Sequence, residues 1–469
     1  MMRTLQAVAA AGMLLAAGCS IGPDYARPST AAPDQWKLAE PQVPVAWPAA
    51  DWWRGFRSPA LDSYIALAQR NNYDIGAATS RVLQADAQVR IAGATLLPQV
   101  DANANVSRQR FGRDVVGRTV TTYTTRYSTS VAASYEVDFW GRNRATRASA
   151  EALAAASRFD RETVAITVLA NVALTYFQAL EALDRLAIAR ENLANAERVL
   201  ALVEARAAAG AASALEIAQQ RAVVAAQRAT IPNFEQQVQL SENALAILLG
   251  QPPSAVRIAS GSLNDIALPE VSPGLPSELL TRRPDIGSAE AQLFAANADI
   301  KAARAAFFPS IPLTAQYGYE SLALSSLFTP ASLFYGAVAS LTQPIFTGGR
   351  LTGQAELTEA RYEELALSYR QTVISAFADV EDALATSRQS AEQQRLQEDA
   401  VAQAQIAFDL ADARYRAGAV DLLVVLDAQR NLFQARDLLA QVKSARLQSV
   451  VTLFRALGGG WQGVLPETE

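Results

Sequence analysis

Residues that could carry out a chemical reaction are scarce in this chain. None of its 469 residues is a histidine, and Cys19 is the single cysteine, which excludes imidazole-based catalysis and ordinary zinc sites. The carboxylate pairs Glu363-Glu364 and Glu381-Asp382 are adjacent in sequence and so point in different directions on a helix, as on a solvated face. Gly458-Gly459-Gly460 follows a predicted helix and does not open one, so it indicates a helix end rather than a phosphate loop. The sequence therefore predicts a protein that is not an enzyme and uses no dissociable cofactor.

Cys19 has one specific reaction open to it because of the residues before it. Arg3 precedes an apolar stretch, residues 5–17, which is too short to span a bilayer and has the length of a secretory signal. The stretch ends in Leu14-Leu15-Ala16-Ala17-Gly18-Cys19, which resembles a bacterial lipobox. The resemblance implies cleavage after residue 18, a covalent N-acyl and S-diacylglycerol lipid on Cys19, and, with Ser20 next, transfer to the outer membrane. An ordinary signal peptide with an incidental cysteine is the alternative.

Composition and charge exclude further classes of protein. The formal net charge is −5, so the chain carries no electrostatic footprint for nucleic acid. Half of the residues are apolar and 19% are charged, a balance that suits long, closely packed helices. After the leader we expect no membrane-spanning helix, because each apolar run soon meets a charge or an amide. A mature protein that crosses a membrane would then have to do so with strands.

An internal repeat predicts the elements that position any functional residue. Asp74-Ile75-Gly76 recurs 211 residues later as Asp285-Ile286-Gly287, and Gly141-Arg142 recurs 208 residues later as Gly349-Arg350. Each half therefore predicts the order helix, strand, loop, strand, very long helix, tight turn, helix. The long helices, residues 142–210 and 350–418, contain no proline and would each reach about 100 Å.

The repeat also sets the predicted domain boundaries. Two Pro- and Gly-rich stretches interrupt the helices and read as irregular connections around the middle of the protein. The predicted parts are a signal peptide (1–18), a lipid-anchored irregular N-terminal segment (19–60), a first structural repeat (61–250), an equatorial connection (251–276), a second structural repeat (277–460) and a C-terminal tail (461–469).

Four segments alternate apolar and polar residues with a period of two. They lie at 100–107, 127–139, 311–320 and 333–346, and we expect residues 111–125 to form an exposed loop. Such alternation is compatible with a soluble antiparallel sheet that has one wet face. The strand lengths, and aromatic residues near the strand ends, favour strands that cross a bilayer.

Four strands are too few to close a membrane barrel, since the smallest spanning barrels have about eight. Open strand edges are not tolerated in lipid, so the chain must complete its barrel with copies of itself. The fold class predicted is mainly α with a membrane β-barrel, built from two tandem repeats. The strand count alone leaves two, three or four copies open.

Several motifs together resemble the TolC-type outer-membrane efflux proteins, in particular the lipoprotein outer-membrane factors of the NodT family. The resemblance covers nearly all of the mature chain. It implies a trimer with a twelve-stranded barrel in the outer membrane of a Gram-negative bacterium, continued by a long α-helical coiled-coil barrel in the periplasm. It also implies passive export of small molecules such as drugs, together with a periplasmic adaptor (membrane fusion) protein and an inner-membrane transporter of the resistance-nodulation-division (RND) type. The motifs are Gly22-Pro23-Asp24-Tyr25, Arg282-Arg283-Pro284-Asp285-Ile286, Pro344-Ile345-Phe346, Gly348-Gly349-Arg350 and Leu426-Asp427-Ala428-Gln429-Arg430.

The resemblance implies an iris-like gate where the helix-turn-helix tips meet at the periplasmic end. By motif matching, Leu423, Asp427 and Arg430 would form the constriction. Three copies of Asp427 would concentrate negative charge in a narrow pore and favour cations there. Tyr415 matches a tyrosine that braces the closed state against an acidic residue of the other tip, for which Glu216 is the candidate.

The tip turns themselves are marked by Gly210 and Gly418. Some relatives carry a bracing arginine just after the tip glycine, where this chain has Ala419 and Val420, so the resemblance supplies no second brace. Two other functions share much of this pattern. One is a type I secretion exit duct for proteins, and the other is a lipid-anchored coiled-coil scaffold that does not span the membrane.

Four arginines cluster around the outer end of the first predicted strand and the loop after it: Arg108, Arg110, Arg113 and Arg118. Guanidinium groups bind phosphate bidentately, so this cluster predicts contact with lipopolysaccharide phosphates. A solvated loop is the alternative.

Overall fold

The protein is represented by a computed structural model that describes residues 21–30, 32–37, 47–115, 118–258, 260–271, 274, 276–461 and 463, without the side chains of residues 113–120. Cys19 and the predicted signal peptide lie outside these residues. The chain forms two compact units, each assembled from separate stretches of sequence. Unit 1 contains Arg81–Arg158, Ser288–Arg370 and the described residues up to Ser29. Unit 2 contains Phe159–Gly287, Gln371–Glu469 and Thr30–Ser80, again within the described part of the chain.

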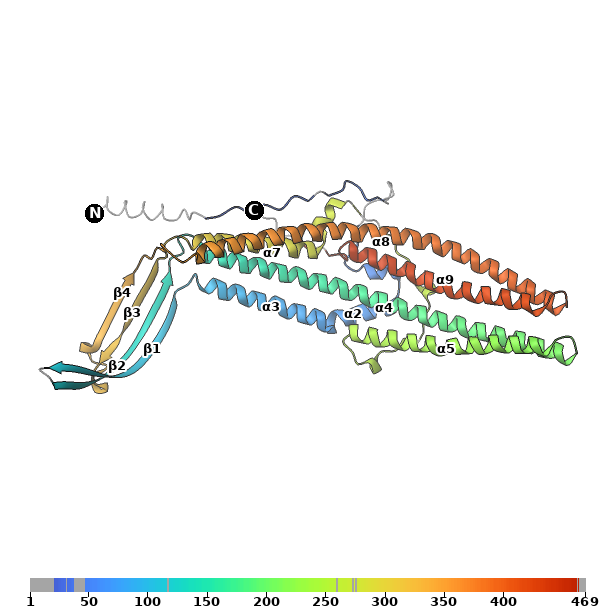
Figure 1. The fold of residues 1–469 in the computed structure, drawn as a ribbon, viewed down its shortest axis with the longest axis horizontal. Helices are drawn as coiled ribbons and strands as arrows, with labels where there is room; N and C mark the ends of the chain where they lie inside the picture. Colours follow the sequence, from blue (N-terminus) through green and yellow to red (C-terminus); the bar gives the residue numbers. More distant parts are fainter. Residues whose placement is uncertain are drawn as a thin grey trace. The chain divides into compact units, whose positions relative to one another are not determined.

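The elements follow the same order in the two halves of the sequence (Figure 1). The long helices α4 and α8 each have 67 residues, the helices α5 and α9 each have 35, and α3 and α7 each have 22. The first half contains α2 (Pro59–Asn71), α3 (Tyr73–Ala94), β1 (Gln99–Val115), β2 (Arg118–Glu136), α4 (Arg142–Ala208) and α5 (Ala214–Leu248). The second half contains α6 (Leu279–Arg282), α7 (Pro284–Ala305), β3 (Pro312–Ser321), β4 (Leu333–Ala339), α8 (Arg350–Arg416) and α9 (Leu422–Ala456).

Unit 1 contains one antiparallel sheet with the strand order β1-β2-β3-β4. The sequence-based expectation of a loop over residues 111–125 was wrong, because β1 and β2 stay paired as far as Val115 and Arg118. The fourth strand is shorter than expected, since after Ala339 one isolated bridge, between Ser310 and Thr342, extends the pairing. Within the described chain, β1 and β4 each pair on one side only.

The register of the sheet separates apolar from polar residues on β1, β2 and β3, whereas β4 has no polar residue on either face. Side chains of directly paired residues share a face, and the face alternates along each strand. The apolar face carries Val100, Ala102, Ala104, Val106, Tyr127, Thr129, Val131, Ala133, Tyr135, Leu313, Ala315, Tyr317, Tyr319, Leu333, Tyr335, Ala337 and Ala339. The polar face carries Asp101, Asn103, Asn105, Ser107, Arg126, Ser128, Ser130, Ala132, Ser134, Thr314, Gln316, Gly318, Glu320, Phe334, Gly336 and Val338.

The helical stretch before β1 is divided at Asn72 into α2 and α3. The backbone of Asn72 is extended. The Asn72 side-chain oxygen accepts from the backbone N–H groups of Asp74 at 2.9 Å and Ile75 at 3.1 Å, which caps α3. Its side-chain amide donates to the backbone oxygen of Leu248 at 2.8 Å, the last residue of α5. A break that ties the end of α5 to the start of α3 is a tertiary feature, which the helical pattern alone did not predict.

The hydrophobic core of unit 2 forms around the middle of α4. Phe177 and Leu180 are fully buried, and the Phe177 ring lies 5.0 Å from that of Phe56, while Trp52 stacks on Phe454 at 4.9 Å. The expectation that no apolar run after the leader could span a bilayer needs correction. By length and composition α4 passes that test, with a mean hydropathy of 1.6 over 18 residues, half of them buried. Because the middle of α4 supplies core residues of unit 2, we assign this helix to packing.

Candidate functional site

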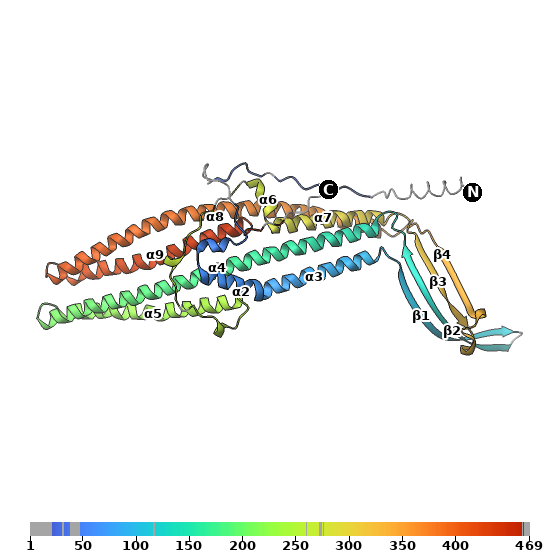
Figure 2. The ribbon, with the colours of Figure 1, turned by 180° about the vertical axis from the view of Figure 1, so that it is seen from behind.

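Two helix-turn-helix tips lie at the same end of unit 2, one between α4 and α5 and one between α8 and α9 (Figures 1 and 2). The two turns have the same backbone structure. Gly210 has a φ of 74° and Gly418 a φ of 72°, the left-handed region that favours glycine. The N–H of Ala211 donates to the backbone oxygen of Arg206 at 2.8 Å, and that of Ala419 to the oxygen of Arg414 at 2.9 Å. The predicted tip glycines therefore stand where the structure reverses direction.

The helices that leave the two turns are capped differently. At the start of α5, the Ser213 hydroxyl accepts from the Glu216 N–H at 3.3 Å, and the Glu216 carboxylate accepts from the Ser213 N–H at 2.6 Å. This reciprocal capping box holds Glu216 in the first helical turn. At the start of α9, Asp421 alone accepts from the N–H of Val424, at 3.4 Å. The first cap therefore also orients a carboxylate toward the tip.

Tyr415 is the largest side chain in the core between the tips, with 1% of its surface exposed. Around it pack Val199 and Val203 of α4, Phe408 and Ala411 of α8, and Leu422, Val425 and Leu432 of α9. Its hydroxyl donates to Glu216 Oε1 across a distance of 3.4 Å, so the structure brings together the two residues that the sequence paired as a brace. Burial and the neighbouring Glu216 carboxylate both raise the pKa of Tyr415, which keeps the hydroxyl a donor.

Arg206, which no sequence motif singled out, completes this contact. Its guanidinium lies over the Tyr415 ring, 4.3 Å from the ring centre, and donates to the backbone oxygen of Tyr415. It also donates to the oxygen of Ala211 at 3.4 Å, within the turn. A signal existed, because Arg206 lies in the last turn of α4, where a cation complements the helix dipole. An arginine therefore contacts the α8–α9 tip from α4, whereas Ala419 and Val420 follow Gly418.

The pKa of Glu216 is lowered by this environment. The largest cause is the hydrogen bond from the Ser213 backbone N–H, with smaller contributions from the Tyr415 hydroxyl and the Arg206 charge. Each of these groups stabilises the ionised carboxylate more than the neutral acid. Arg206, Tyr415 and Glu216 therefore form one connected unit, which we call the tip brace.

The predicted constriction residues share an exposed face of α9. Leu423, Asp427 and Arg430 are spaced four and three residues apart, so they lie on one side of the helix. Leu423 is 65% exposed, and the side chains of Asp427 and Arg430 are 57% and 66% exposed. Arg430 forms an ion pair with Asp427 of the same helix, so in the protomer the expected negative charge is partly neutralised.

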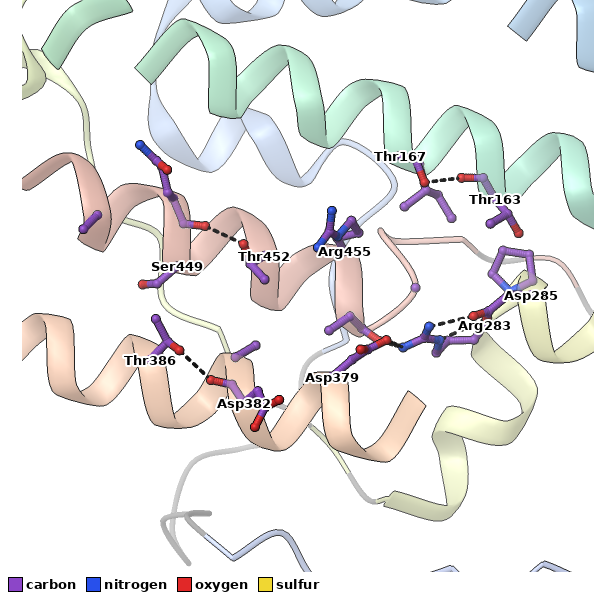
Figure 3. A pocket seen from close by; sticks show the side chains of 17 residues that line it. Thr163, Thr167, Arg283, Asp285, Asp379, Asp382, Thr386, Ser449, Thr452 and Arg455 are labelled. Carbon is purple, nitrogen blue, oxygen red and sulfur yellow. Dashed lines mark hydrogen bonds and ion pairs between the residues drawn. The ribbon is translucent and has the colours of Figure 1, made fainter. Parts of the chain in front are cut away.

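A cavity of about 590 Å³ lies elsewhere in unit 2, between α4, α8, α9 and the start of α7 with Arg283 before it (Figure 3). Arg283 donates to Asp285 at 2.6 Å and 3.0 Å, to Asp379 at 3.0 Å and to the backbone oxygen of Ala456 at 3.2 Å. Burial opposes the charge of Arg283, but the two carboxylates outweigh it and raise its pKa. Among the described residues, no group of three or more acidic, histidine or cysteine side chains could hold a metal ion. The cavity wall therefore contains a hydrogen-bonded contact, centred on Arg283, between segments that are far apart in sequence.

Comparison with known proteins agrees with these features. The sequence profile of the outer membrane efflux proteins matches residues 64–251 and 275–459. The chain is 44% identical over 455 residues to the pyoverdine export outer membrane protein OpmQ of Pseudomonas aeruginosa, covering 96% of this chain and 95% of OpmQ. It is 36% identical to the cation efflux system protein CusC of Escherichia coli K12, covering 94% of this chain and 96% of CusC.

Among solved structures, the Campylobacter jejuni CmeC outer membrane channel is similar with a TM-score of 0.88 at 26% identity, and the match covers 96% of each chain. This mainly helical chain, with its long helices and one antiparallel sheet, matches the structures of outer-membrane efflux channels. The chain belongs to the outer membrane efflux protein family, and it acts in export at the outer membrane.

Proposed function

We propose that three copies of the chain close a twelve-stranded barrel in the outer membrane. The proposal rests on the sheet of unit 1. One of its faces is apolar, and the other is mainly polar on β1, β2 and β3, as in a barrel wall between lipid and water. Its edge strands β1 and β4 leave backbone donors and acceptors unpaired on one side within the described chain. Such edges cannot face lipid, so β1 of one copy pairs with β4 of the next.

Engineered cysteines test this arrangement, with Cys19 left in place. Asn103→Cys in β1 is combined with a cysteine at each of Phe334, Gly336 and Val338 of β4, all on the polar face. Oxidation of at least one pair should give disulfide-linked dimers and trimers. The pair Asn103→Cys and Ser130→Cys, directly opposed within the protomer, serves as a positive control. Monomers alone from every β1–β4 pair, with the control pair oxidised, would refute the barrel.

We further propose that the paired helices of the three copies form an α-helical coiled-coil tunnel in the periplasm, closed by the tips. Leu423, Asp427 and Arg430 would line the constriction, and the tip brace would hold it shut. A covalent N-acyl and S-diacylglycerol lipid on Cys19 would anchor each copy. The two structural repeats (61–250 and 277–460) would each supply two strands of the β-barrel and the helices of the tunnel. Residues 251–276 would form the equatorial connection.

In this proposal the channel is passive and does no catalysis. It would receive small molecules from an inner-membrane transporter of the RND type through a periplasmic adaptor protein. OpmQ is named for pyoverdine export and CusC for cation efflux, and the chain has greater identity to OpmQ. We therefore propose an organic small molecule as the exported substrate. Purified Tyr415→Ala protein, in which the tip brace is broken, should conduct ions in planar bilayers without any energy source. Absence of current from correctly assembled trimers of this variant would refute the channel.

A further inference from the structure

The apolar face of the sheet ends abruptly in basic residues on β1. Val100 and Val106 lie on this face and are 64% and 66% exposed. The next two positions of β1 on the same face are Arg108 and Arg110, opposite Thr125 and Tyr123 of β2. At about 3.3 Å per residue, Arg108 lies about 7 Å and Arg110 about 13 Å beyond Val106 along the strand.

Aromatic residues mark the same boundary. Tyr127 pairs with Val106, and Tyr317 and Tyr319 of β3 lie on the same face nearby. Aromatic rings with one polar end collect where the hydrocarbon core of a membrane meets the headgroups. Along β1 the apolar face therefore changes from aliphatic residues through this aromatic level to guanidinium groups, as a lipid changes from acyl chain to headgroup.

Arg108 and Arg110 differ from the arginine on the other side of the sheet. Arg126, on the polar face, forms an ion pair with Glu320. Among the described side chains, neither Arg108 nor Arg110 has a carboxylate partner. Arg108 lies over the Tyr123 ring, 5.3 Å from its centre, and Arg110 makes one long contact of 3.4 Å to the Thr121 hydroxyl. Within the described side chains, most of their N–H donors therefore have no acceptor.

We propose that Arg108 and Arg110 bind the phosphate groups of a phosphorylated glycolipid of the lipid A type in the outer leaflet. The acyl chains would lie along Val100, Ala104 and Val106, and the planar guanidinium groups would hold the phosphates bidentately. The site rests on the proposed function, because it needs the apolar face to meet lipid. The sequence had grouped Arg113 and Arg118 with this pair, but their side chains lie outside the described part of the chain and are not needed here.

Native mass spectrometry of the full-length protein in detergent tests the site with three lipids: bis-phosphorylated lipid A, the same lipid after phosphatase treatment, and phosphatidylglycerol. Wild-type protein should bind bis-phosphorylated lipid A most tightly. Arg108→Gln and Arg110→Gln should each weaken this binding about tenfold, the usual effect of losing one charge-assisted contact, and should leave binding of the dephosphorylated lipid unchanged. Inorganic phosphate in the buffer should not compete at millimolar concentration, because it lacks the acyl chains.

Arg126→Gln is the matched control, since it removes one positive charge from the same sheet on the polar face. It should retain wild-type affinity for lipid A. Arg108→Lys with Arg110→Lys keeps the charge and should fall between wild type and the double glutamine variant. Equal binding of the phosphorylated and dephosphorylated lipids would overturn the site, and so would an equal loss in Arg126→Gln.

Ion conductance of each variant in phospholipid bilayers separates this inference from the function beneath it. A protein that conducts but does not distinguish the lipids overturns the phosphate site alone. A protein that forms no conducting trimer overturns the proposed channel as well.

Discussion

The two tips of unit 2 have the same backbone and different side-chain chemistry. Both turn on a glycine with positive φ, and both close the helix with the same pair of backbone hydrogen bonds. The α4–α5 tip supplies two charged groups, Arg206 and Glu216, whereas the α8–α9 tip supplies the buried ring of Tyr415 between them. Each tip therefore contributes a different part of the tip brace.

This difference shows how two copies of one hairpin can come to make complementary contacts. At the separation of 208 residues that relates the halves, Arg206 corresponds to Arg414, which is exposed, and Tyr415 corresponds to Ala207. The turn is thus a property of either hairpin alone, while the brace exists only when both hairpins meet. Changes to the brace should act across the two tips, and changes to a turn should stay within one.

The largest effect is expected for Tyr415→Ala. Truncating a buried aromatic residue to alanine costs about 3–5 kcal/mol in a protein core, because contacts are lost and a cavity remains. Hydrogen exchange should then accelerate at both tips, in α4 and α5 as well as in α8 and α9, and single-channel conductance and sensitivity to vancomycin-sized antibiotics should rise. Faster exchange in the α8–α9 tip alone, with unchanged conductance, would mean that the ring does not join the two tips.

A smaller effect is expected for Arg206→Ala, which leaves the backbone oxygen of Tyr415 without its charged donor. Losing a hydrogen bond of this kind costs about 1–3 kcal/mol, and conductance should rise again. Arg414→Ala is the matched control at the corresponding position of the other hairpin, and as an exposed substitution it should stay within about 0.5 kcal/mol. Equal effects of the two variants would remove the asymmetry on which the comparison depends.

The tip glycines test the feature that the two tips share, which is the backbone structure of the turn. A Cβ added to Gly210 or Gly418 would meet no atom within 4 Å, so the cost of alanine arises from the left-handed backbone alone. That cost is about 1 kcal/mol at each turn. Gly210→Ala and Gly418→Ala should therefore speed hydrogen exchange of their own turns to the same extent. A large difference between them would show that a turn does more than reverse the chain.

Much of this arrangement could be predicted from sequence, for physical reasons that are local. Glycine at a left-handed turn, absence of proline over 67 residues and alternation along a strand are all properties of neighbouring residues, so α4, α8 and both tip glycines were placed correctly. The pairing of Tyr415 with Glu216 came from motif resemblance, and the structure places the two side chains 3.4 Å apart.

The features that were missed depend on residues far apart in sequence. Arg206 of α4 contacts Tyr415 of α8, 209 residues later in the sequence. Asn72 interrupts a helical pattern because its side chain forms a hydrogen bond with the end of α5. The strands β1 and β2 continue to Val115 and Arg118 through a polar segment, because cross-strand pairing does not require apolar side chains. The pairing of Asp427 with Arg430 was also not anticipated, although a spacing of three residues on a helix permits it.

The smallest effect is expected from pH, through Glu216. Its pKa in the folded protein lies below the ordinary value of 4.5, so the ionised form stabilises the brace, fully so above that value. As the pH falls through the lowered pKa, the carboxylate is protonated and this contribution is lost. Conductance should therefore be constant from neutral pH down to about 4.5 and rise only below it. Glu216→Gln should remove that rise while the capping hydroxyl of Ser213 remains in place. The same acid-induced rise in Glu216→Gln would assign it to another carboxylate, and the α4–α5 tip would then contribute Arg206 as its single charged group in the brace.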